Sequence, residues 1–85
     1  MQIDLHSLSL KEAKEIINKN IKYCYKNNIY TLEIIHGFNN GSKIKNYLIN
    51  SKSLRENNPE IKQILPDLTN SGKSIIYLKM KIKES

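Results

Sequence analysis

The sequence predicts an α/β protein: a single domain over residues 1–85, built as a two-layer sandwich of helices on a mixed sheet. Two periodicities predict this class. Near both ends of the chain polar and apolar side chains alternate, as in strands with one buried face, and between them apolar residues recur at steps of three and four, as in amphipathic helices. The length of 85 residues is typical of one domain.

The first expected strand covers residues 2–6. Its apolar side chains, Ile3 and Leu5, fall on one side of the strand. Its polar side chains, Asp4 and His6, fall on the other, so the alternation places an acid and an imidazole next to each other on the exposed side.

A helix is expected to follow from about residue 10 to residue 26. Ser9 and Glu12 have the spacing of a capping box, in which the two side chains satisfy free N–H groups at the helix start. The stripe expected to face the sheet consists of Leu10, Ala13, Ile17, Ile21 and Cys24. Asn27-Asn28 is a plausible stop, because asparagine tolerates the left-handed conformation at a helix end.

The middle of the chain predicts a strand, a loop and a second helix. Residues 30–36 are largely apolar and rich in β-formers, which indicates a central strand buried on much of both faces. Residues 38–41 are expected to form a loop, and a helix to run from about residue 42 to residue 52. The side chains expected to face inward on this helix are Ile44, Tyr47, Leu48 and Ser51.

Two further strands are expected, at residues 61–65 and 73–83, joined by a turn-rich loop. Ile61 and Leu65 are expected to share the buried face of the shorter strand. The inward side chains of the longer strand are expected to be Ile76, Leu78, Met80 and Ile82.

The expected order is therefore β-α-β-α-β-β. Strands joined through helices should be parallel with right-handed crossovers. The last two strands, joined by a short loop, should be antiparallel. With both helices mainly on one face, the other sheet face is expected to be partly open and to show Lys79 and Lys81.

The chain carries 14 Lys and Arg against 8 Asp and Glu, a net charge of +6. A basic surface attracts polyanions by counterion release, so DNA or RNA is the expected partner. The alternative is a solubilising surface in a protein from an AT-rich genome, which the abundance of Lys, Asn and Ile also suggests.

Cys24 is the single cysteine, so an internal disulfide is excluded and a reducing cytoplasm is expected. No apolar run approaches the ~20 residues of a membrane span. No basic region followed by an apolar stretch opens the chain. We therefore expect a cytoplasmic protein with no membrane association and no signal peptide. The sequence leaves its oligomeric state open.

Two polar clusters carry the candidate chemistry. In the first, the Cα atoms of Asp4 and His6 should lie about 6.5–7 Å apart on one strand face, so both side chains can reach one phosphate. Histidine can act as general acid or base at neutral pH. Asp4 could orient the imidazole or bind a divalent cation such as Mg²⁺ or Mn²⁺, and no cation at all is the other possibility. The plainer alternative is a polar strand edge.

The second cluster begins at His36, which closes the second strand. Because parallel neighbours bring their carboxyl ends together, His6 and His36 are expected to converge at one sheet edge. The alternative is a strand-end histidine bonded to a loop carbonyl.

The loop and helix start that follow His36 are candidates for binding phosphate. Glycine frees a loop to approach a phosphate closely. The expected start of the second helix would add unpaired N–H groups and a partial positive charge. The candidate phosphate-binding residues are Gly37, Asn39, Asn40, Gly41, Ser42, Lys43 and Lys45, with Lys79 and Lys81 on the open sheet face. The alternative for the glycines is a plain turn.

These two clusters together resemble the Smr domain, a small module related to the C-terminus of some MutS-type proteins. The first motif is Ile3-Asp4-Leu5-His6 before the capped helix, and the second is Ile34-Ile35-His36-Gly37 before a glycine-containing loop. The chain departs from the family pattern at two positions. Ser7 stands where the family usually has glycine, and Asn39 replaces a loop glycine, although asparagine tolerates positive φ.

The resemblance implies a fold similar to the C-terminal domain of bacterial translation initiation factor three. It implies an endonuclease that hydrolyses DNA or RNA with weak sequence preference, with Asp4, His6 and His36 as catalytic residues, and a role in DNA repair or recombination. Two alternatives stay open: a non-catalytic module that binds nucleic acid or a ribosome-like surface through the same face, and a protein-interaction domain.

Overall fold

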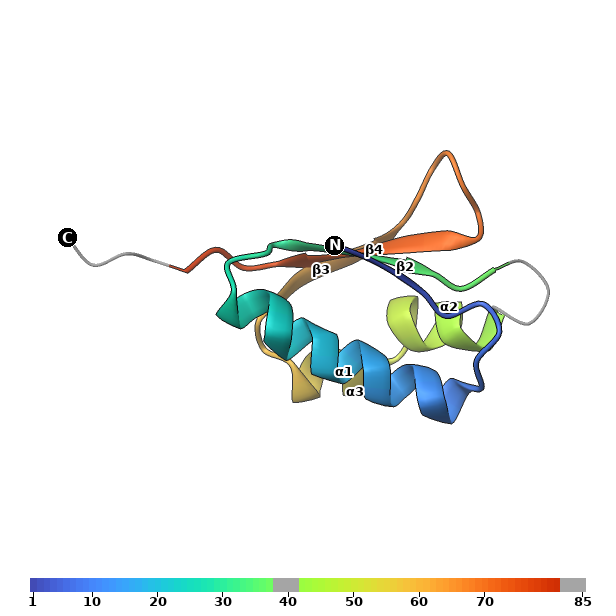
Figure 1. Ribbon diagram of the computed structural model, residues 1–85, viewed down its shortest axis with the longest axis horizontal. Helices are drawn as coiled ribbons and strands as arrows, with labels where there is room; N and C mark the ends of the chain where they lie inside the picture. The colour runs from blue at the N-terminus through green and yellow to red at the C-terminus, as the bar shows by residue number, and fades with distance from the viewer. Residues whose placement is uncertain (38–41, 82–85) are drawn as a thin grey trace.

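The computed structural model describes residues 1–37 and 42–81 and has two layers, with the helices together on one side of the sheet (Figure 1). The sheet has four strands in the order β1-β2-β4-β3. None of the helices in the described residues lies on the other sheet face (Figure 1). The α/β sandwich with a mixed sheet that the sequence predicts is therefore confirmed.

The central strand β2 (Thr31–Ile35) organises the sheet, because it pairs on both sides. On one side it pairs in parallel with the short edge strand β1 (Gln2–Asp4). On the other it pairs antiparallel with β4 (Lys73–Leu78), which in turn pairs antiparallel with the second edge strand β3 (Ile61–Pro66). The carboxyl ends of β1 and β2 therefore meet at the same edge of the sheet.

Helix α1 (Leu10–Lys26) connects the two parallel strands and lies across the sheet (Figure 1). Both bonds of the predicted capping box are present: the Ser9 hydroxyl accepts from the Glu12 N–H, and the Glu12 carboxylate accepts from the Ser9 N–H. The side chains that α1 buries are Ala13, Ile17, Ile21 and Cys24. The predicted stripe is confirmed, with Leu10 half-buried at its start.

The single second helix predicted over residues 42–52 is wrong. The structure has α2 (Ser42–Ile49) and a separate short helix, α3 (Lys52–Asn57), so the order is β-α-β-α-α-β-β. Ser51, expected as an inward residue of the second helix, is instead the N-cap of α3, where its side chain accepts from the Ser53 N–H. A serine that bonds a nearby backbone N–H in this way competes with helix continuation.

The prediction that Ile61 and Leu65 lie on the same face of the third strand is also wrong. A register shift between Ile61 and Gln63 changes which side chains face the helices. Ile61 and Ile64 are buried, whereas Leu65, predicted to share the face of Ile61, is exposed. An extra residue in one strand of an antiparallel pair moves every later side chain to the opposite face.

Three strands are shorter than predicted, and β2 loses one residue at each end. The first ends at Asp4 and not at residue 6, and β4 ends at Leu78 and not at residue 83. Met80, predicted to face inward, is 74% exposed. Ile82 lies outside the described residues. In the described part of the chain, no helix has the length and apolar character needed to cross a membrane.

The core lies between the sheet and the helices and includes three buried polar side chains. Asn58 donates to Asn18 Oδ1 at 2.6 Å and to the Leu54 carbonyl at 2.9 Å, and Asn18 donates to the Tyr47 hydroxyl at 2.9 Å. This network ties the end of α3 to both longer helices. The other two buried polar residues are His36 and Ser74.

We expect Leu54→Ala to destabilise the protein by about 2–5 kcal/mol, because Leu54 is the one side chain that α3 buries and its truncation leaves a cavity. Leu68→Ala is the matched control, since Leu68 is 98% exposed and should change stability by less than about 0.5 kcal/mol. Urea unfolding of both variants measures the difference, and equal effects would contradict the assignment of α3 to the core.

Candidate functional site

Asp4 and His6 lie at the carboxyl end of β1, on either side of a buried anchor. Leu5 is 1% exposed, and its N–H donates to the Ile35 carbonyl at 2.7 Å, which fastens the chain to the end of β2. The alternation predicted from the sequence is confirmed, because Asp4 and His6 are both exposed. The two polar side chains therefore project into solvent from a backbone that the Leu5 hydrogen bond holds in place.

The Asp4 carboxylate and the His6 imidazole are hydrogen-bonded to each other. Asp4 Oδ1 accepts from the His6 backbone N–H at 3.1 Å and contacts His6 Nδ1. These bonds, the side-chain one first, hold the pKa of Asp4 below its usual range, so the carboxylate is ionised at neutral pH. An ionised carboxylate at Nδ1 favours the tautomer with the proton on Nδ1, which leaves Nε2 as an acceptor.

Gly37 connects the second motif to the first. Its φ is +82°, and a Cβ built there would lie 3.1 Å from His6 Cβ. This position therefore favours glycine for two reasons: the backbone is left-handed, and a side chain would press on His6. The two histidine motifs, 30 residues apart in the sequence, touch at this point.

His36 lies beneath this contact and is 1% exposed. Its Nε2 is 3.0 Å from Ser74 Oγ, and its Nδ1 is 3.1 Å from the Gly37 carbonyl oxygen. A carbonyl oxygen can only accept, so Nδ1 carries the proton and Nε2 accepts from the Ser74 hydroxyl. Burial lowers the pKa of His36, so the ring is neutral.

The backbone at His36 and Gly37 is fixed by the residue that precedes the neighbouring strand β4. Both N–H groups donate to the carbonyl oxygen of Gly72, at 2.9 and 3.0 Å. Sequence reasoning missed Gly72 and Ser74 as parts of the site. Ser74 gives a usable signal, since it is a hydroxyl at an inward position of an alternating strand, where a buried donor needs a partner.

The structure therefore brings His6 and Gly37 together. It buries the side chain of His36, which the sequence suggested would lie beside His6 at the site. The predicted convergence of both histidines at one sheet edge holds for the backbone. A direct catalytic role for His36 stays a prediction. Its burial and its two hydrogen bonds favour the alternative, a strand-end histidine that holds the Gly37 carbonyl and so positions the residue against which His6 rests.

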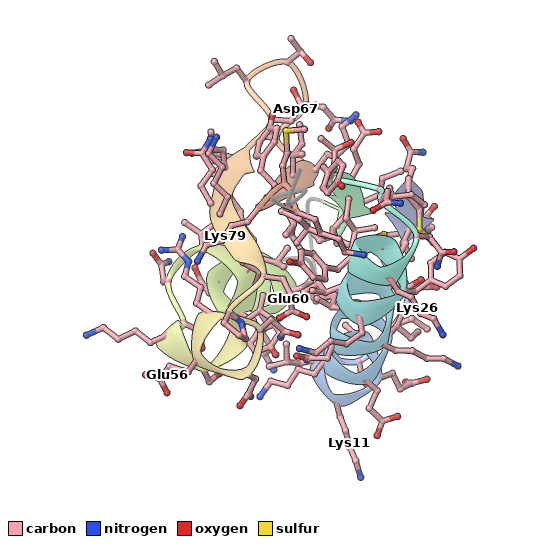
Figure 2. All side chains as sticks on the ribbon, turned by 90° about the vertical axis from the view of Figure 1, so that its left-hand side faces the viewer. Lys11, Lys26, Glu56, Glu60, Asp67 and Lys79 are labelled. Atoms are coloured by element: carbon pink, nitrogen blue, oxygen red, sulfur yellow. The ribbon has the colours of Figure 1, made fainter. Side chains whose placement is uncertain are left out.

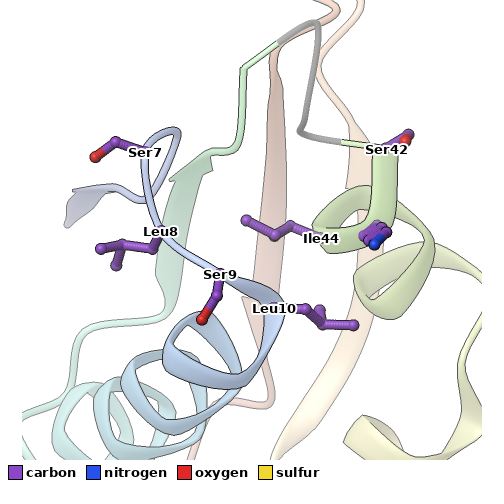
Figure 3. A pocket seen from close by; sticks show the side chains of 7 residues that line it. Ser7, Leu8, Ser9, Leu10, Ser42 and Ile44 are labelled. Atoms are coloured by element: carbon purple, nitrogen blue, oxygen red, sulfur yellow. The ribbon is translucent and has the colours of Figure 1, made fainter.

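Beside His6 lies a hollow of about 440 Å³, lined by residues 7–10 and 42–44. Figure 3 shows the chain from Ser7 to Leu10 facing the start of α2, with Ser42 and Ile44 on the opposite wall. Two of the predicted phosphate-binding residues, Ser42 and Lys43, line this hollow, and Lys45 follows on the first turn of α2, which has no acidic residue. The predicted loop residues Asn39, Asn40 and Gly41 lie outside the described residues.

Lys79 and Lys81 are not part of this site. They follow β4, whose Tyr77 pairs with Thr31 at the start of β2, whereas the site lies at the end of β2. The Lys79 N–H donates to the Glu60 carbonyl, and Lys81 Nζ lies 4.9 Å from the centre of the Tyr25 ring on α1. The antiparallel direction of β4 thus carries both lysines to the opposite end of the sheet.

The described side chains around Asp4 and His6 do not by themselves form a set of metal ligands. Within residues 1–37 and 42–81, no three His, Cys, Asp or Glu side chains gather as metal ligands. Asp4 is the carboxylate next to His6, and its Oδ1 already holds two hydrogen bonds.

Fold and site together define a small two-layer α/β module with an exposed acid–imidazole pair beside the start of a basic helix. The model of the Smr domain family matches residues 3–79, and the chain belongs to that family. Smr domains are nucleic-acid-binding and endonuclease-type modules.

A solved structure shares the fold. The crystal structure of the Smr domain of Thermus thermophilus MutS2 matches with a TM-score of 0.73 at 17% sequence identity, covering 92% of this chain and 96% of that one. A search of the curated proteins found no match. The predicted resemblance to the Smr domain is confirmed, by the family model and by the fold.

We expect the stability of the wild type to fall as the pH drops below about 6.5, the usual pKa of histidine. Burial lowers the pKa of His36 in the folded state, so the unfolded chain binds the proton more tightly and protonation favours unfolding. The slope from one group is at most about 1.4 kcal/mol per pH unit.

His36→Gln should lower stability at pH 7.5 but flatten this pH dependence, because the titrating group is gone. Urea unfolding between pH 7.5 and 5.5 measures both effects, and the lowered pKa values of the carboxylates act only at more acidic pH. Leu68→Ala is the control and should keep the wild-type slope. A wild-type slope in His36→Gln would show that another group causes the dependence.

We expect Gly37→Ala to cost about 1–2 kcal/mol for the left-handed backbone and to displace His6. The chemical shifts of the His6 backbone amide and imidazole should change, together with a loss of thermal stability. Ser7→Ala, a change at an exposed neighbour of His6, is the control and should leave both measurements nearly unchanged. Wild-type shifts in Gly37→Ala would show that His6 does not depend on this contact.

Proposed function

We propose that this chain is an endonuclease that hydrolyses phosphodiester bonds in DNA or RNA with weak sequence preference. One observation carries the proposal: the exposed, hydrogen-bonded pair of Asp4 and His6, with side chains 52% and 60% exposed. A carboxylate that holds one imidazole nitrogen and leaves the other facing solvent is the arrangement by which enzymes orient a histidine for proton transfer.

In this mechanism His6 Nε2 takes the proton of the attacking oxygen as that oxygen adds to phosphorus. In DNA the attacking group is a water molecule. In RNA it is the 2′-hydroxyl, which breaks the P–O5′ bond and leaves a 2′,3′-cyclic phosphate that water then opens to complete the hydrolysis. Asp4 keeps the proton of the ring on Nδ1 and stabilises the imidazolium that forms. The leaving oxygen then receives a proton from the imidazolium or from water.

The hollow beside His6 supplies the binding part of the proposal. It is lined by Ser7, Ser42 and Lys43, at the start of a helix. N–H groups at a helix start, together with lysine charge, favour a phosphate. Ser7 lines the hollow and directly follows His6 in the chain, so we expect a phosphodiester bound there to come within reach of the imidazole.

A second candidate function is binding without cleavage, to nucleic acid or to a ribosome-like surface. The distribution of charge favours it. The helical part of the chain, residues 9–29 and 42–60, carries nine basic and four acidic residues. The other described residues carry four basic and three acidic ones, so the positive charge is concentrated in the helix layer. Such a surface binds polyanions whether or not His6 is reactive.

We expect Asp4→Asn and His6→Gln each to lower the cleavage rate about 10²–10⁴-fold, the usual contribution of one acid–base group, and to leave nucleic-acid affinity within a few fold. Glu15→Gln is the matched control, because it removes the same charge as Asp4→Asn at an exposed position on α1. Labelled single-stranded RNA, structured RNA and duplex DNA, with magnesium and with chelator, are the substrates.

Loss of cleavage in the two site variants, with activity kept in Glu15→Gln, supports the nuclease and identifies its substrate. The chelator shows whether a cation added with the substrate takes part. Binding by the wild type without cleavage of any substrate contradicts the nuclease and supports the binding module. Absence of both points to a protein partner.

A further inference from the structure

A groove between α1 and α2 continues from the hollow beside His6. A second hollow of about 450 Å³ is lined by Leu10 and Lys14 on α1 and by residues 43, 46, 47, 50 and 51 on and after α2. Leu10 and Lys43 line both hollows, so the two adjoin. We call the pair of hollows the α1–α2 groove. It begins at Ser7, next to His6, and extends along the whole of α2.

The charge in the groove fits a polyanion. Its two charged lining residues are Lys14 and Lys43, and none of the described residues that line either hollow is acidic. Lys14 Nζ lies 5.0 Å from the centre of the Tyr47 ring, which places the ammonium group at the groove wall. The surrounding helix layer is the basic part of the chain. Figure 2 shows Lys11 and Lys26 on α1, on the side opposite Asp67.

The remaining lining suits bases that are not paired. Half-buried Leu8 and Leu10 give the first hollow an apolar side. In the second, Asn50 donates to the Asn46 side chain at 3.0 Å, so two exposed amides stand one turn apart along the groove. A duplex turns its phosphates outward and hides the faces and the Watson–Crick edges of its bases, whereas a single strand can place bases against apolar side chains and amides.

We propose that the α1–α2 groove binds a single strand of nucleic acid, with its backbone on Lys14 and Lys43 and its bases toward the leucines and amides. This inference rests on the proposed function and names the substrate as single-stranded. A strand that follows the groove passes Ser7 and presents a phosphodiester to His6. Helix α2, at eight residues, is about 12 Å long, which gives room for a few nucleotides.

The test compares binding by the full chain of labelled single-stranded RNA, single-stranded DNA and duplex, each about 12 nucleotides long. Fluorescence anisotropy is recorded over a range of salt concentrations. The groove variant is Lys14→Gln with Lys43→Gln. Its control is Lys19→Gln with Lys62→Gln, which removes the same charge from exposed positions on α1 and β3 outside the groove.

We expect the wild type to bind single strands more tightly than duplex. The groove variant should weaken single-strand binding roughly 10- to 30-fold at about 0.1 M salt, because each lost contact lowers the salt slope by about 0.7. The control variant should weaken it only a few fold. Asn46→Ala with Asn50→Ala, which changes no charge, should weaken binding without changing the salt slope.

Equal weakening by the groove and control variants, or tighter binding of duplex, overturns the inference. The proposed function then still stands if Asp4→Asn and His6→Gln abolish cleavage. Failure of the wild type to bind any nucleic acid overturns both the inference and the proposed function on which it rests.

Discussion

The carbonyl oxygen of Gly72 holds the part of the molecule on which the candidate site depends. It accepts from the N–H groups of both His36 and Gly37, and so fixes the chain where β2 ends and the left-handed turn begins. From there the contacts run outward. His36 bonds the Gly37 carbonyl and Ser74, Gly37 lies against His6, and His6 bonds Asp4. The exposed acid–imidazole pair is thus supported by a buried, neutral histidine.

The two layers of the protein divide charge between them. On the open sheet face Lys73 is paired with Glu33 at 2.8 Å and with Asp67 at 3.2 Å, so its charge is balanced locally. The helix layer keeps most of the excess positive charge, with Lys22 paired to Glu60 at 2.7 Å. Because the sheet edge that carries Asp4 and His6 adjoins the starts of α1 and α2, the reactive pair lies where the sheet meets the basic helices. In the proposed mechanism, that junction would give a phosphate both an attractive field and a proton acceptor.

Local rules explain what could be predicted from the sequence. The alternation around Asp4, the capping box at Ser9 and the stripe on α1 depend on neighbours within one or two turns, and all three are found in the structure. Ser51, which ended one helix to begin another, is a local exception, because its side chain bonds the backbone only two residues on. The other features that could not be predicted depend on partners far along the chain. The bulge near Gln63, in the pairing with β4, turned Leu65 outward. The burial of His36 follows from Ser74 and Gly72, which lie more than 30 residues away and have no motif of their own.

The support of the site from Gly72 has a consequence for the order of folding. The Asp4–His6 bond spans two residues and can form in a short segment, but the turn that braces His6 needs a hairpin from the last quarter of the described chain. Contacts of such high sequence separation form late, after the loop-closure entropy has been overcome. During synthesis on the ribosome Asp4 and His6 emerge before Gly72 and Ser74, on which their support depends. We therefore expect the Asp4–His6 pair to reach its final geometry only when the fold is complete. A partly synthesised chain contains both residues but not the contacts that position His6.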